Sequence, residues 1–367
     1  MLSRRRFIAS ATLLAGGAIE LGGHAKAKES VLRENWFMPD EAEPHTRTWM
    51  AFGASKKIWG SKYLPEVQRN LAMLAQTIAK YEPVSMLVRE SDYRLAKKLV
   101  GASVELIVFL LDDIWIRDTG PVFVITEQGK KAAVNLNFNG WGEKQEFAQD
   151  AKVAEFVAKR AGVDVIHTEL ILEGGGIEVD GHGNAIISES CVLNDNRNPG
   201  VTKHQFEEQI STLLGLEKII WLPGIKGKDI TDGHTDFYAR FARPNIVLAG
   251  YDPDPKSYDH KVTKRHLQIL KTAKNAQGFQ VTVVVLEGPK SVREKFETDE
   301  FAAGYIGFYV CNGAVIAQEF GDKRADTAAR NALQKAFPGR NIVQINIDGI
   351  ASGGGSIHCA TQQEPKV

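Results

Sequence analysis

The stretch SGGGSIHCATQQ, residues 352–363, lies near the C-terminus of this 367-residue chain. The preceding segments are interpreted in relation to it. An apolar run that we expect to form a strand, 342–347, leads into its three consecutive glycines. Glycine allows positive φ angles and close approach of the backbone. The stretch therefore predicts a turn that presents Cys359 to a small bound molecule. The alternative is a structural role, because free cysteine is among the most frequently buried residue types.

A repeated alternation of strands and helices extends through the chain before this stretch. Apolar runs recur at intervals of roughly 55–65 residues, which is typical of a repeat architecture. They lie at 104–110, 163–168, 217–222, 281–286 and 341–347. Amphipathic segments predicted as helices lie at 64–80, 93–100, 145–161, 202–214, 257–274 and 323–336. Together they indicate an α/β protein.

The strand repeat also predicts how the chain closes. Each of the first four apolar runs is followed by a polar loop and two short strands joined by a tight turn. The fifth unit ends soon after Cys359 and could be completed by the early strand 48–52. This pairing would close a ring of about five ββαβ-type units and leave no long sheet edge exposed.

The polar loops carry the residues suited to chemistry. The first reads WIRDTGP from Trp115 to Pro121, the second holds Glu173 and three glycines, and the third reads DGHTD from Asp232 to Asp236. The last loop holds Cys359. If the units are equivalent, the loops lie at one end of the ring and converge on its axis. One thiol, one imidazole and several carboxylates would then share a pocket.

A thiol beside an imidazole and carboxylates favours attack on a cation. A cysteine nucleophile needs a base or a nearby cation, because an ordinary thiol with a pKa near ~8.5 is mostly protonated. His234 could activate Cys359 and later protonate a leaving group. Carboxylates suit a guanidinium, whose N–H groups pair with them in a fork. Attack by Cys359, loss of ammonia and hydrolysis of the thiouronium would convert a guanidine into a urea.

The chain resembles the agmatine deiminase family, which includes the bacterial peptidyl-arginine deiminases, within the guanidine-modifying superfamily. The similar segments follow the family's order over nearly the whole mature chain: 38–45, 48–51, 115–121, 139–142, 173–175, 191–199, 231–236 and 353–363. The resemblance implies a five-fold pseudo-symmetric α/β propeller. It also implies hydrolytic deimination of a guanidinium substrate with no metal and no organic cofactor.

The resemblance assigns roles to particular residues. It implies Cys359 as nucleophile, His234 as general acid and base, and Asp118 and Asp236 as carboxylates that bind the guanidinium. It also implies three substrate-binding residues: the pocket carboxylate Glu173 and the aromatic residues Trp115 and Trp141.

Several of these residues have simpler interpretations. Asp118 could pair with the adjacent Arg117, and Glu173 could cap the turn made by the glycines that follow it. Cys191 and Cys311 are expected to be buried, although a disulfide between them stays open. The His-x-Asp of residues 234–236 lacks the further ligands that a metal site needs.

Two expectations rest on strand geometry. His234 and Asp236 alternate at the start of a predicted strand and should face the same side. His358 and Cys359 are adjacent, so their side chains should point to opposite faces and His358 should not serve Cys359 directly.

The substrate within the guanidine class stays open at this point. The loop 139–142 reads NGWG without a basic residue, which is closer to the agmatine enzymes, so agmatine is favoured. Peptidyl-arginine is the alternative, and Arg240 is a candidate contact for an anion on such a substrate. In a different class, a periplasmic receptor for a guanidine or polyamine would need no thiol beside His234.

The first 27 residues predict export. Three arginines precede Phe7, a modestly apolar run follows, and Ala25-Lys26-Ala27 resembles a cleavage site. The arginine pair indicates a twin-arginine signal and a periplasmic protein whose mature part, 28–367, forms one catalytic domain. With 45 basic and 45 acidic residues, no nucleic-acid partner is indicated. No membrane contact is expected after cleavage, and a homo-oligomer stays open.

Overall fold

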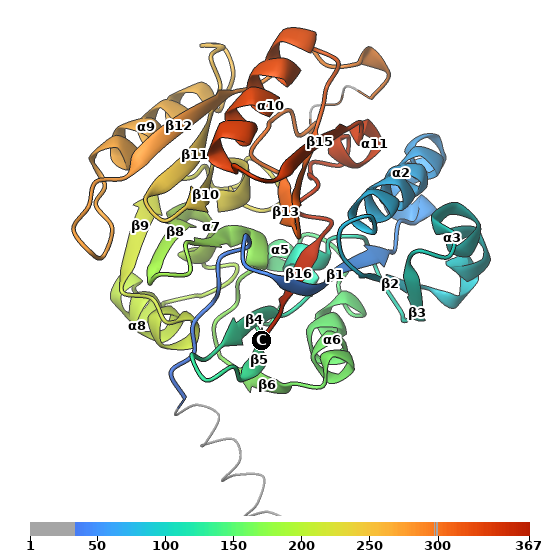
Figure 1. The fold of residues 1–367 in the computed structure, drawn as a ribbon, viewed down its shortest axis with the longest axis horizontal. Coiled ribbons are helices and arrows are strands. Elements are labelled where there is room, and N and C mark those ends of the chain that lie inside the picture. Colours follow the sequence, from blue (N-terminus) through green and yellow to red (C-terminus); the bar gives the residue numbers. More distant parts are fainter. Residues whose placement is uncertain (1–33, 297, 299) are drawn as a thin grey trace, which may run out of the picture. The chain divides into compact units, whose positions relative to one another are not determined.

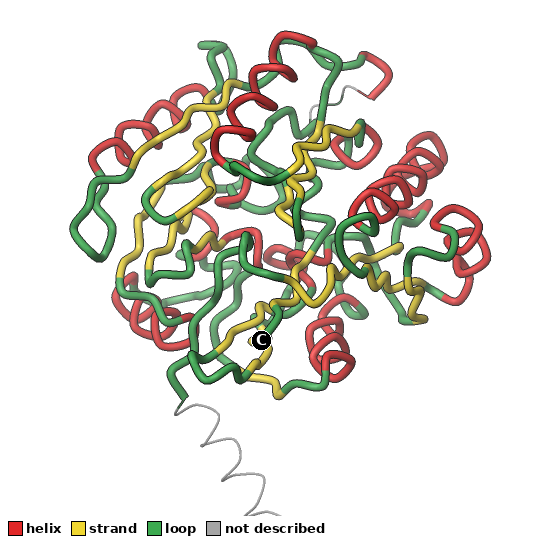
Figure 2. The backbone as a smooth tube through the Cα atoms, in the orientation of Figure 1, coloured by secondary structure: helices red, strands yellow, loops and turns green. Residues whose placement is uncertain are grey.

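Small β-sheets flanked by helices form the framework of the protein (Figure 1). The computed structural model describes residues 34–296, 298 and 300–367, so the predicted export signal lies outside the described residues. Residues Asn35–Val367 form one compact unit. In the backbone tube of this unit, the longer helices (red) lie toward the periphery and the strands (yellow) nearer the middle (Figure 2).

Four three-stranded sheets share one design. In each, an antiparallel hairpin is followed by a strand parallel to its second member. The sheets are β4 (Val122–Ile125), β5 (Lys131–Asn135) and β6 (Asp164–His167); β7 (Ile177–Val179), β8 (Asn184–Ser188) and β9 (Lys218–Leu222); β10 (Ala239–Arg243), β11 (Ile246–Tyr251) and β12 (Thr282–Glu287); and β13 (Tyr309–Cys311), β14 (Ala314–Gln318) and β15 (Asn341–Ile345).

A fifth sheet joins the two ends of the described chain. Its strand order is β16 (Gln362–Pro365), β1 (His45–Phe52), β2 (Val84–Val88) and β3 (Glu105–Val108). Strand β16 pairs antiparallel with β1, with Thr48 opposite Gln363 (Figure 1). The predicted completion of the last unit by the early strand is therefore confirmed. Strand β2 was not predicted, because it is buried throughout and lacks the alternation that marks a half-exposed strand.

The predicted boundaries of the repeat were wrong by one strand. The prediction grouped each apolar strand with the hairpin that follows it. In the structure, the apolar strand closes the preceding sheet, and the polar loop carries the chain to the next one. A parallel pair needs a crossover connection, so β6 pairs with β5, the strand that precedes its crossover helix.

All six predicted helices are present. They are α2 (Lys56–Ile78), α3 (Tyr93–Val100), α6 (Val153–Ala161), α8 (Lys203–Leu214), α9 (His260–Thr272) and α10 (Lys323–Ala336). Most of their ends lie within three residues of the prediction, but α2 begins at Lys56 instead of residue 64 and α6 begins at Val153 instead of residue 145. Helix α8 begins with a capping box made by Thr202 and Gln205. Helix α2 starts earlier than predicted, because Ser55 caps it and the chain kinks at Gly60. Among the described residues, no helix combines the length and apolar character needed to cross a bilayer.

Short helical turns connect these elements. They are η1 (Glu90–Asp92), α4 (Ile116–Thr119), α5 (Gly140–Glu143), η2 (Asp150–Lys152), η3 (Gly174–Gly176), α7 (Glu189–Val192), η4 (Thr235–Phe237), η5 (Glu294–Phe296) and α11 (Asp348–Ala351). Turn α11 corrects one prediction, because β15 does not run directly into the glycine triplet. Five of these turns (α4, η3, η4, η5 and α11) lie in the loops that pass from one sheet to the next.

Candidate active site

A cavity of about 940 Å³ opens where the loops between sheets meet. Its wall includes residues of the first, third and last loops, among them Trp115, Asp118, His234 and Cys359. Glu300 of the fourth loop also lines it. The predicted convergence on one pocket is confirmed for the first, third and last loops, whereas no residue of the second loop, which holds Glu173, lines the cavity.

The glycine triplet allows two indole rings to lie against the loop that carries Cys359. A Cβ atom on Gly353 would lie 2.4 Å from the ring of Trp59, and one on Gly355 would lie 2.0 Å from the ring of Trp115. Gly354 has a φ of 82°, which L side chains rarely adopt. Trp59 and Trp115 contact each other with ring centroids 5.7 Å apart. The glycines are thus needed for close approach and for one left-handed turn.

Cys359 presents a protonated thiol beside two polar partners. Its Sγ lies 3.2 Å from Ser356 Oγ and 3.6 Å from Asp236 Oδ2. Burial raises the pKa of the Cys359 thiol well above its usual value, and the Asp236 and Asp118 carboxylates raise it further. A positive charge that enters the site would therefore favour the thiolate.

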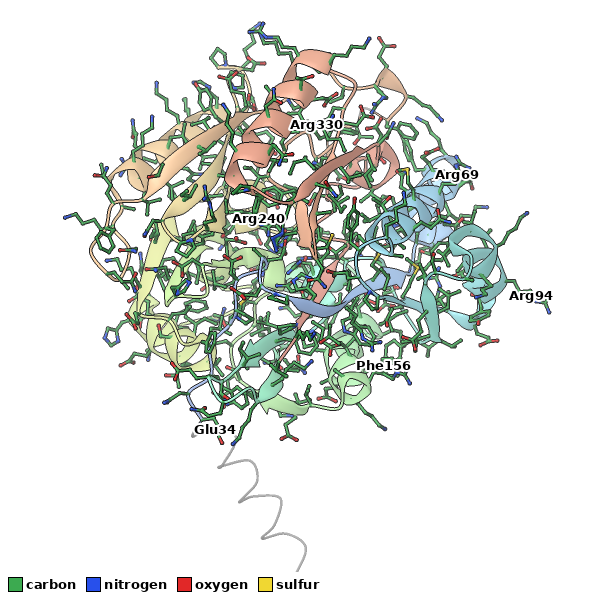
Figure 3. All side chains as sticks on the ribbon, viewed as in Figure 1. Glu34, Arg69, Arg94, Phe156, Arg240 and Arg330 are labelled. Carbon is green, nitrogen blue, oxygen red and sulfur yellow. The ribbon has the colours of Figure 1, made fainter. Side chains whose placement is uncertain are left out.

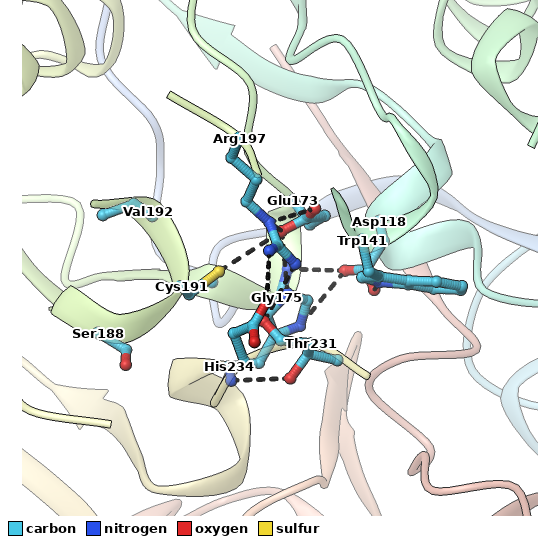
Figure 4. Close-up of polar contacts among 12 residues, drawn as sticks. Asp118, Trp141, Glu173, Gly175, Ser188, Cys191, Val192, Arg197, Thr231 and His234 are labelled. Atoms are coloured by element: carbon cyan, nitrogen blue, oxygen red, sulfur yellow. Dashed lines mark hydrogen bonds and ion pairs between the residues drawn. The ribbon is translucent and has the colours of Figure 1, made fainter. Parts of the chain in front are cut away.

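Asp118, His234 and Asp236 converge on Gly175, as Figure 4 shows for the first two. A Cβ atom on Gly175 would lie 2.6 Å from His234 Nδ1, 3.0 Å from Asp118 Oδ1 and 3.1 Å from Asp236 Oδ2. The predicted strand at 234–236 is wrong, since these residues begin the turn η4, yet both side chains face Gly175 as expected. A missing side chain leaves room for the three groups to meet.

Asp118 is held by neutral donors. Its Oδ1 accepts a hydrogen bond from the backbone N–H of Gly175 (3.0 Å), and its Oδ2 accepts one from Trp141 Nε1 (2.9 Å; Figure 4). It is not paired with Arg117, which binds Glu41 instead. Burial raises the pKa of Asp118 to about 6, with repulsion from Glu173 and Asp236 adding to the shift. The free site thus resists full ionisation of this carboxyl.

Two buried atoms of the cluster have no hydrogen-bond partner among the described residues. They are Asp236 Oδ1 and His234 Nδ1. His234 Nδ1 lies 3.8 Å from Asp118 Oδ1. Buried polar atoms are normally satisfied, so the unsatisfied acceptor Asp236 Oδ1 beside a thiol indicates a place for a ligand with N–H groups.

The other ring nitrogen of His234, Nε2, is held by a buried ion pair between Glu173 and Arg197. His234 Nε2 lies 3.2 Å from Glu173 Oε2, and Arg197 Nε lies 2.8 Å and 3.0 Å from the two Glu173 oxygens (Figure 4). Glu173 is fully buried, and neither it nor Asp236 is among the residues that line the cavity. Glu173 makes no capping hydrogen bond to η3, so the capping interpretation is wrong. Its contact with the site runs through His234.

The charges around His234 favour its protonated form. Burial alone would lower the pKa of His234, but Asp118, Cys191 and Glu173 outweigh it and raise this pKa well above its usual value. The ring can therefore act as an acid with a free Nδ1. Glu173 keeps a lowered pKa despite burial, because His234 and Arg197 neutralise it.

Residues 191–199 contribute more than was predicted. Arg197 is fully buried and binds both Glu173 and Asp232, at 2.8 Å in each case. The segment does not cap helix α8, which is capped by Thr202 and Gln205. An arginine between two asparagines in a segment similar to the family was the available signal. All three cysteines are free thiols, so the disulfide left open between Cys191 and Cys311 does not form.

The described residues contain one cluster with metal-ligand spacing, which is Glu173, Cys191 and His234, with ligand atoms within 4.8 Å of one another. Cys191 Sγ already donates to Glu173 at 3.5 Å. The Arg197 guanidinium on Glu173 opposes a second cation there. These contacts favour a hydrogen-bonded cluster over a metal site.

Two residues outside the predicted site lie directly behind Asp236. His358 Nδ1 lies 2.7 Å from Asp236 Oδ2, although no contact joins His358 to the Cys359 thiol among the described residues. Arg240 was a candidate anion contact, and this prediction is wrong. It is buried in the interior (Figure 3), where Glu41 and Glu178 bind its guanidinium.

The fold and site are those of a hydrolase that acts on carbon–nitrogen bonds. More particularly, the chain belongs to the family of Porphyromonas-type peptidyl-arginine deiminases, whose model matches residues 37–365. Agmatine deiminase of Stutzerimonas stutzeri is 33% identical over 356 residues, covering 91% of this chain and 96% of the relative. That of Pseudomonas fluorescens is 33% identical over 355 residues, covering 90% and 96%.

A solved structure agrees with these sequence matches. Agmatine deiminase of Enterococcus faecalis superposes with a TM-score of 0.85 at 29% identity, covering 97% of this chain and all of that one. The predicted membership of the agmatine deiminase family is therefore confirmed, as is the mixed α/β fold.

Proposed function

We propose that this protein hydrolyses agmatine to N-carbamoylputrescine and ammonia through a covalent thiouronium on Cys359. One observation carries the proposal. Beside the Cys359 thiol, Asp236 Oδ1 and His234 Nδ1 are buried without hydrogen-bond partners among the described residues. A planar guanidinium supplies the N–H groups that Asp236 Oδ1 can accept, while the free His234 Nδ1 stays available to protonate the group that leaves.

The first half of the reaction releases ammonia. A guanidinium bound by Asp118 and Asp236 offsets the repulsion that keeps Cys359 protonated, so the thiol releases its proton to solvent and the thiolate attacks the central carbon. A carbon–sulfur bond forms. His234, protonated in the free site, then donates its proton to the departing amino group as the carbon–nitrogen bond breaks.

The second half regenerates the thiol. Water attacks the thiouronium carbon, and His234, now neutral, accepts a proton from it. Collapse of the tetrahedral intermediate breaks the carbon–sulfur bond and leaves a ureido product. The hydroxyl proton of this intermediate returns to the sulfur, and the released ammonia takes up the proton that the thiol gave to solvent. The sum is guanidinium plus water giving urea plus ammonium. In this scheme, Glu173 positions His234 instead of touching the substrate, and Trp115 and Trp141 supply the aromatic wall.

The charge of the cavity supports agmatine over a substrate with a carboxylate. The described lining residues include six carboxyl groups, two lysines and no arginine. One lysine, Lys144, is already paired with Asp232 at 2.7 Å. An acidic wall favours the ammonium end of agmatine, whereas a C-terminal arginine needs a cationic partner. The relatives named above as agmatine deiminases point the same way.

The direct test offers the mature protein agmatine, free arginine and a peptide ending in arginine, with Cys359→Ala as the blank. Ureido product from agmatine alone supports the proposal. Turnover of the peptide alone would assign the protein to peptidyl-arginine instead. Tight binding of agmatine with no product from any substrate would favour the receptor interpretation.

We also propose that the five sheets close into a five-fold pseudo-symmetric propeller, because four share one strand pattern and the fifth joins both ends of the described chain.

Export through a twin-arginine signal stays our proposal for residues 1–27. Periplasmic fractionation checks it, with Arg4-Arg5→Lys-Lys as the variant. Retention of the unprocessed variant inside the cell supports twin-arginine export. A homo-oligomer can be checked by light scattering.

A further inference from the structure

Behind Asp236 lies a buried chain of charged groups that the mechanism above does not use. His358 is buried in the turn before Cys359, and both of its ring nitrogens face carboxylates. Nδ1 lies 2.7 Å from Asp236 Oδ2, and Nε2 lies 2.9 Å from Glu41 Oε2. The ring therefore bridges a carboxylate at the site and a carboxylate of the N-terminal segment.

Glu41 is itself held rigidly. Its Oε2 also accepts a hydrogen bond from Arg117 Nη2 (2.9 Å), while its Oε1 binds Arg240 Nη2 (2.8 Å) and the backbone N–H of Val310 (2.8 Å). Groups from four separate stretches of the chain thus converge on one carboxylate. Because every one of them is buried, Glu41 has little freedom to rotate.

The Asp236 carboxylate has unequal oxygens as a result. Oδ2 faces both His358 Nδ1 and, at 3.6 Å, the Cys359 thiol, whereas Oδ1 has no partner among the described residues. A carboxylate on a single bond can rotate and exchange its oxygens unless a neighbour distinguishes them. Apart from the Cys359 thiol, His358 is the only side chain hydrogen-bonded to this carboxylate among the described residues.

We propose that Glu41 and His358 are positioning residues that fix the rotation of Asp236, which leaves Oδ1 free for the substrate cation. The inference rests on the proposed function, because it assumes that Asp236 binds the guanidinium. His358 does not touch the substrate and acts only through Asp236. Preorganised groups cost less to align when substrate binds, and small misplacements reduce rates strongly.

The two amide substitutions of His358 separate positioning from packing. In His358→Asn, the amide nitrogen takes a place close to Nδ1 and can still donate to Asp236. In His358→Gln, the amide reaches the place of Nε2, so it keeps the contact with Glu41 and loses the one with Asp236. Gln is also closer to histidine in volume. A packing role therefore favours Gln, whereas positioning of Asp236 favours Asn.

The measurement compares two alkylating agents of the same shape, cationic 2-chloroacetamidine and neutral 2-chloroacetamide. The ratio of their rates at Cys359, followed by peptide mass spectrometry, reports cation binding independently of thiol reactivity and needs no turnover. We expect wild type to prefer the amidine, His358→Asn to keep most of this preference, and His358→Gln to lose at least about tenfold of it.

The outcomes are distinct. Equal ratios in the two folded variants, or a larger loss in His358→Asn, would overturn the positioning role while leaving the proposed function intact. No amidine preference in wild type would overturn the cation role of Asp236 and both proposals with it. If thermal melting shows that His358→Gln does not fold, the isosteric Glu41→Gln decides. An unchanged ratio in that variant overturns the proposal, and a reduced ratio with kcat for agmatine also reduced supports it.

Discussion

Two histidines of this protein are equally buried and have opposite roles in its architecture. His234 and His358 each contact a carboxylate through a ring nitrogen. His234 leaves Nδ1 without a partner and lines the cavity, whereas both nitrogens of His358 are occupied and its ring does not reach the cavity. Burial alone therefore does not distinguish a residue that can transfer protons from one that holds its neighbours in place.

The charges around the two rings strengthen the contrast. Burial, Arg117 and Arg240 lower the pKa of His358. Near His234, the Asp118 carboxylate and Glu173 outweigh burial and raise the pKa. Both rings contact carboxylates, but only His358 also has Arg117 and Arg240 acting on its pKa. The lesson is that a free ring nitrogen and the sign of the surrounding charge together mark the acid–base residue.

The largest loss of activity is expected when His234, whose Nδ1 is free, is replaced. His234→Asn eliminates the proton donor for the leaving group, so kcat for agmatine should fall by about 10²–10⁴-fold, the usual contribution of general acid–base catalysis. Initial rates of ureido product check this, with His358→Asn as the matched variant. A loss below about tenfold in His234→Asn would contradict the assigned role.

Steric crowding of His234 Nδ1 should reduce activity nearly as strongly. In Gly175→Ala, the added Cβ would lie within 3.1 Å of His234, Asp118 and Asp236, so kcat/KM should fall by about 100-fold. Gly176→Ala is the control, because its Cβ would meet its nearest neighbours at 3.5 Å and 3.8 Å. Circular dichroism confirms folding. Equal activity of the two variants would show that the convergence on Gly175 is not needed.

The pH dependence sharpens the contrast in charge. Asp118 has a pKa of about 6, and its protonated form is neutral and holds a cation poorly. Below pH 6, kcat/KM should therefore fall about tenfold per unit as Asp118 becomes protonated, and it should level off above that pH. The pH profile of agmatine turnover measures this. A profile that stays flat between about pH 5 and 7 would exclude Asp118 as the group that limits cation binding.

The smallest effect is expected at the thiol behind His234. Cys191 donates to Glu173 at 3.5 Å and does not line the cavity. Losing one such hydrogen bond is worth about 1 kcal/mol, so Cys191→Ala should reduce kcat by no more than about fivefold. Cys359→Ala should leave no turnover. Rate assays of both variants compare the two thiols, and inactivation of Cys191→Ala would mean that Glu173 depends on it.

Local patterns in the sequence determined much of the fold. Apolar periodicity located all six long helices and most strands, because burying one face of a helix requires that periodicity wherever the helix packs. The repeat also indicated that β1 completes the last sheet, since a C-terminal hairpin strand without a partner would leave an open edge. The loops with Cys359, His234 and Asp118 were likewise identified from their residue types.

Only the tertiary structure decided how these residues are paired. Each polar group has several acceptable partners in a sequence, and the choice depends on packing between segments far apart in the chain. Arg240 was a candidate contact for an anion on the substrate and instead binds Glu41 in the interior. His358 was not expected to serve Cys359, and in the structure it binds Asp236. The residue types of the site can therefore be predicted from short motifs. The partner of each ring nitrogen and each carboxylate oxygen depends on contacts between segments far apart in the chain.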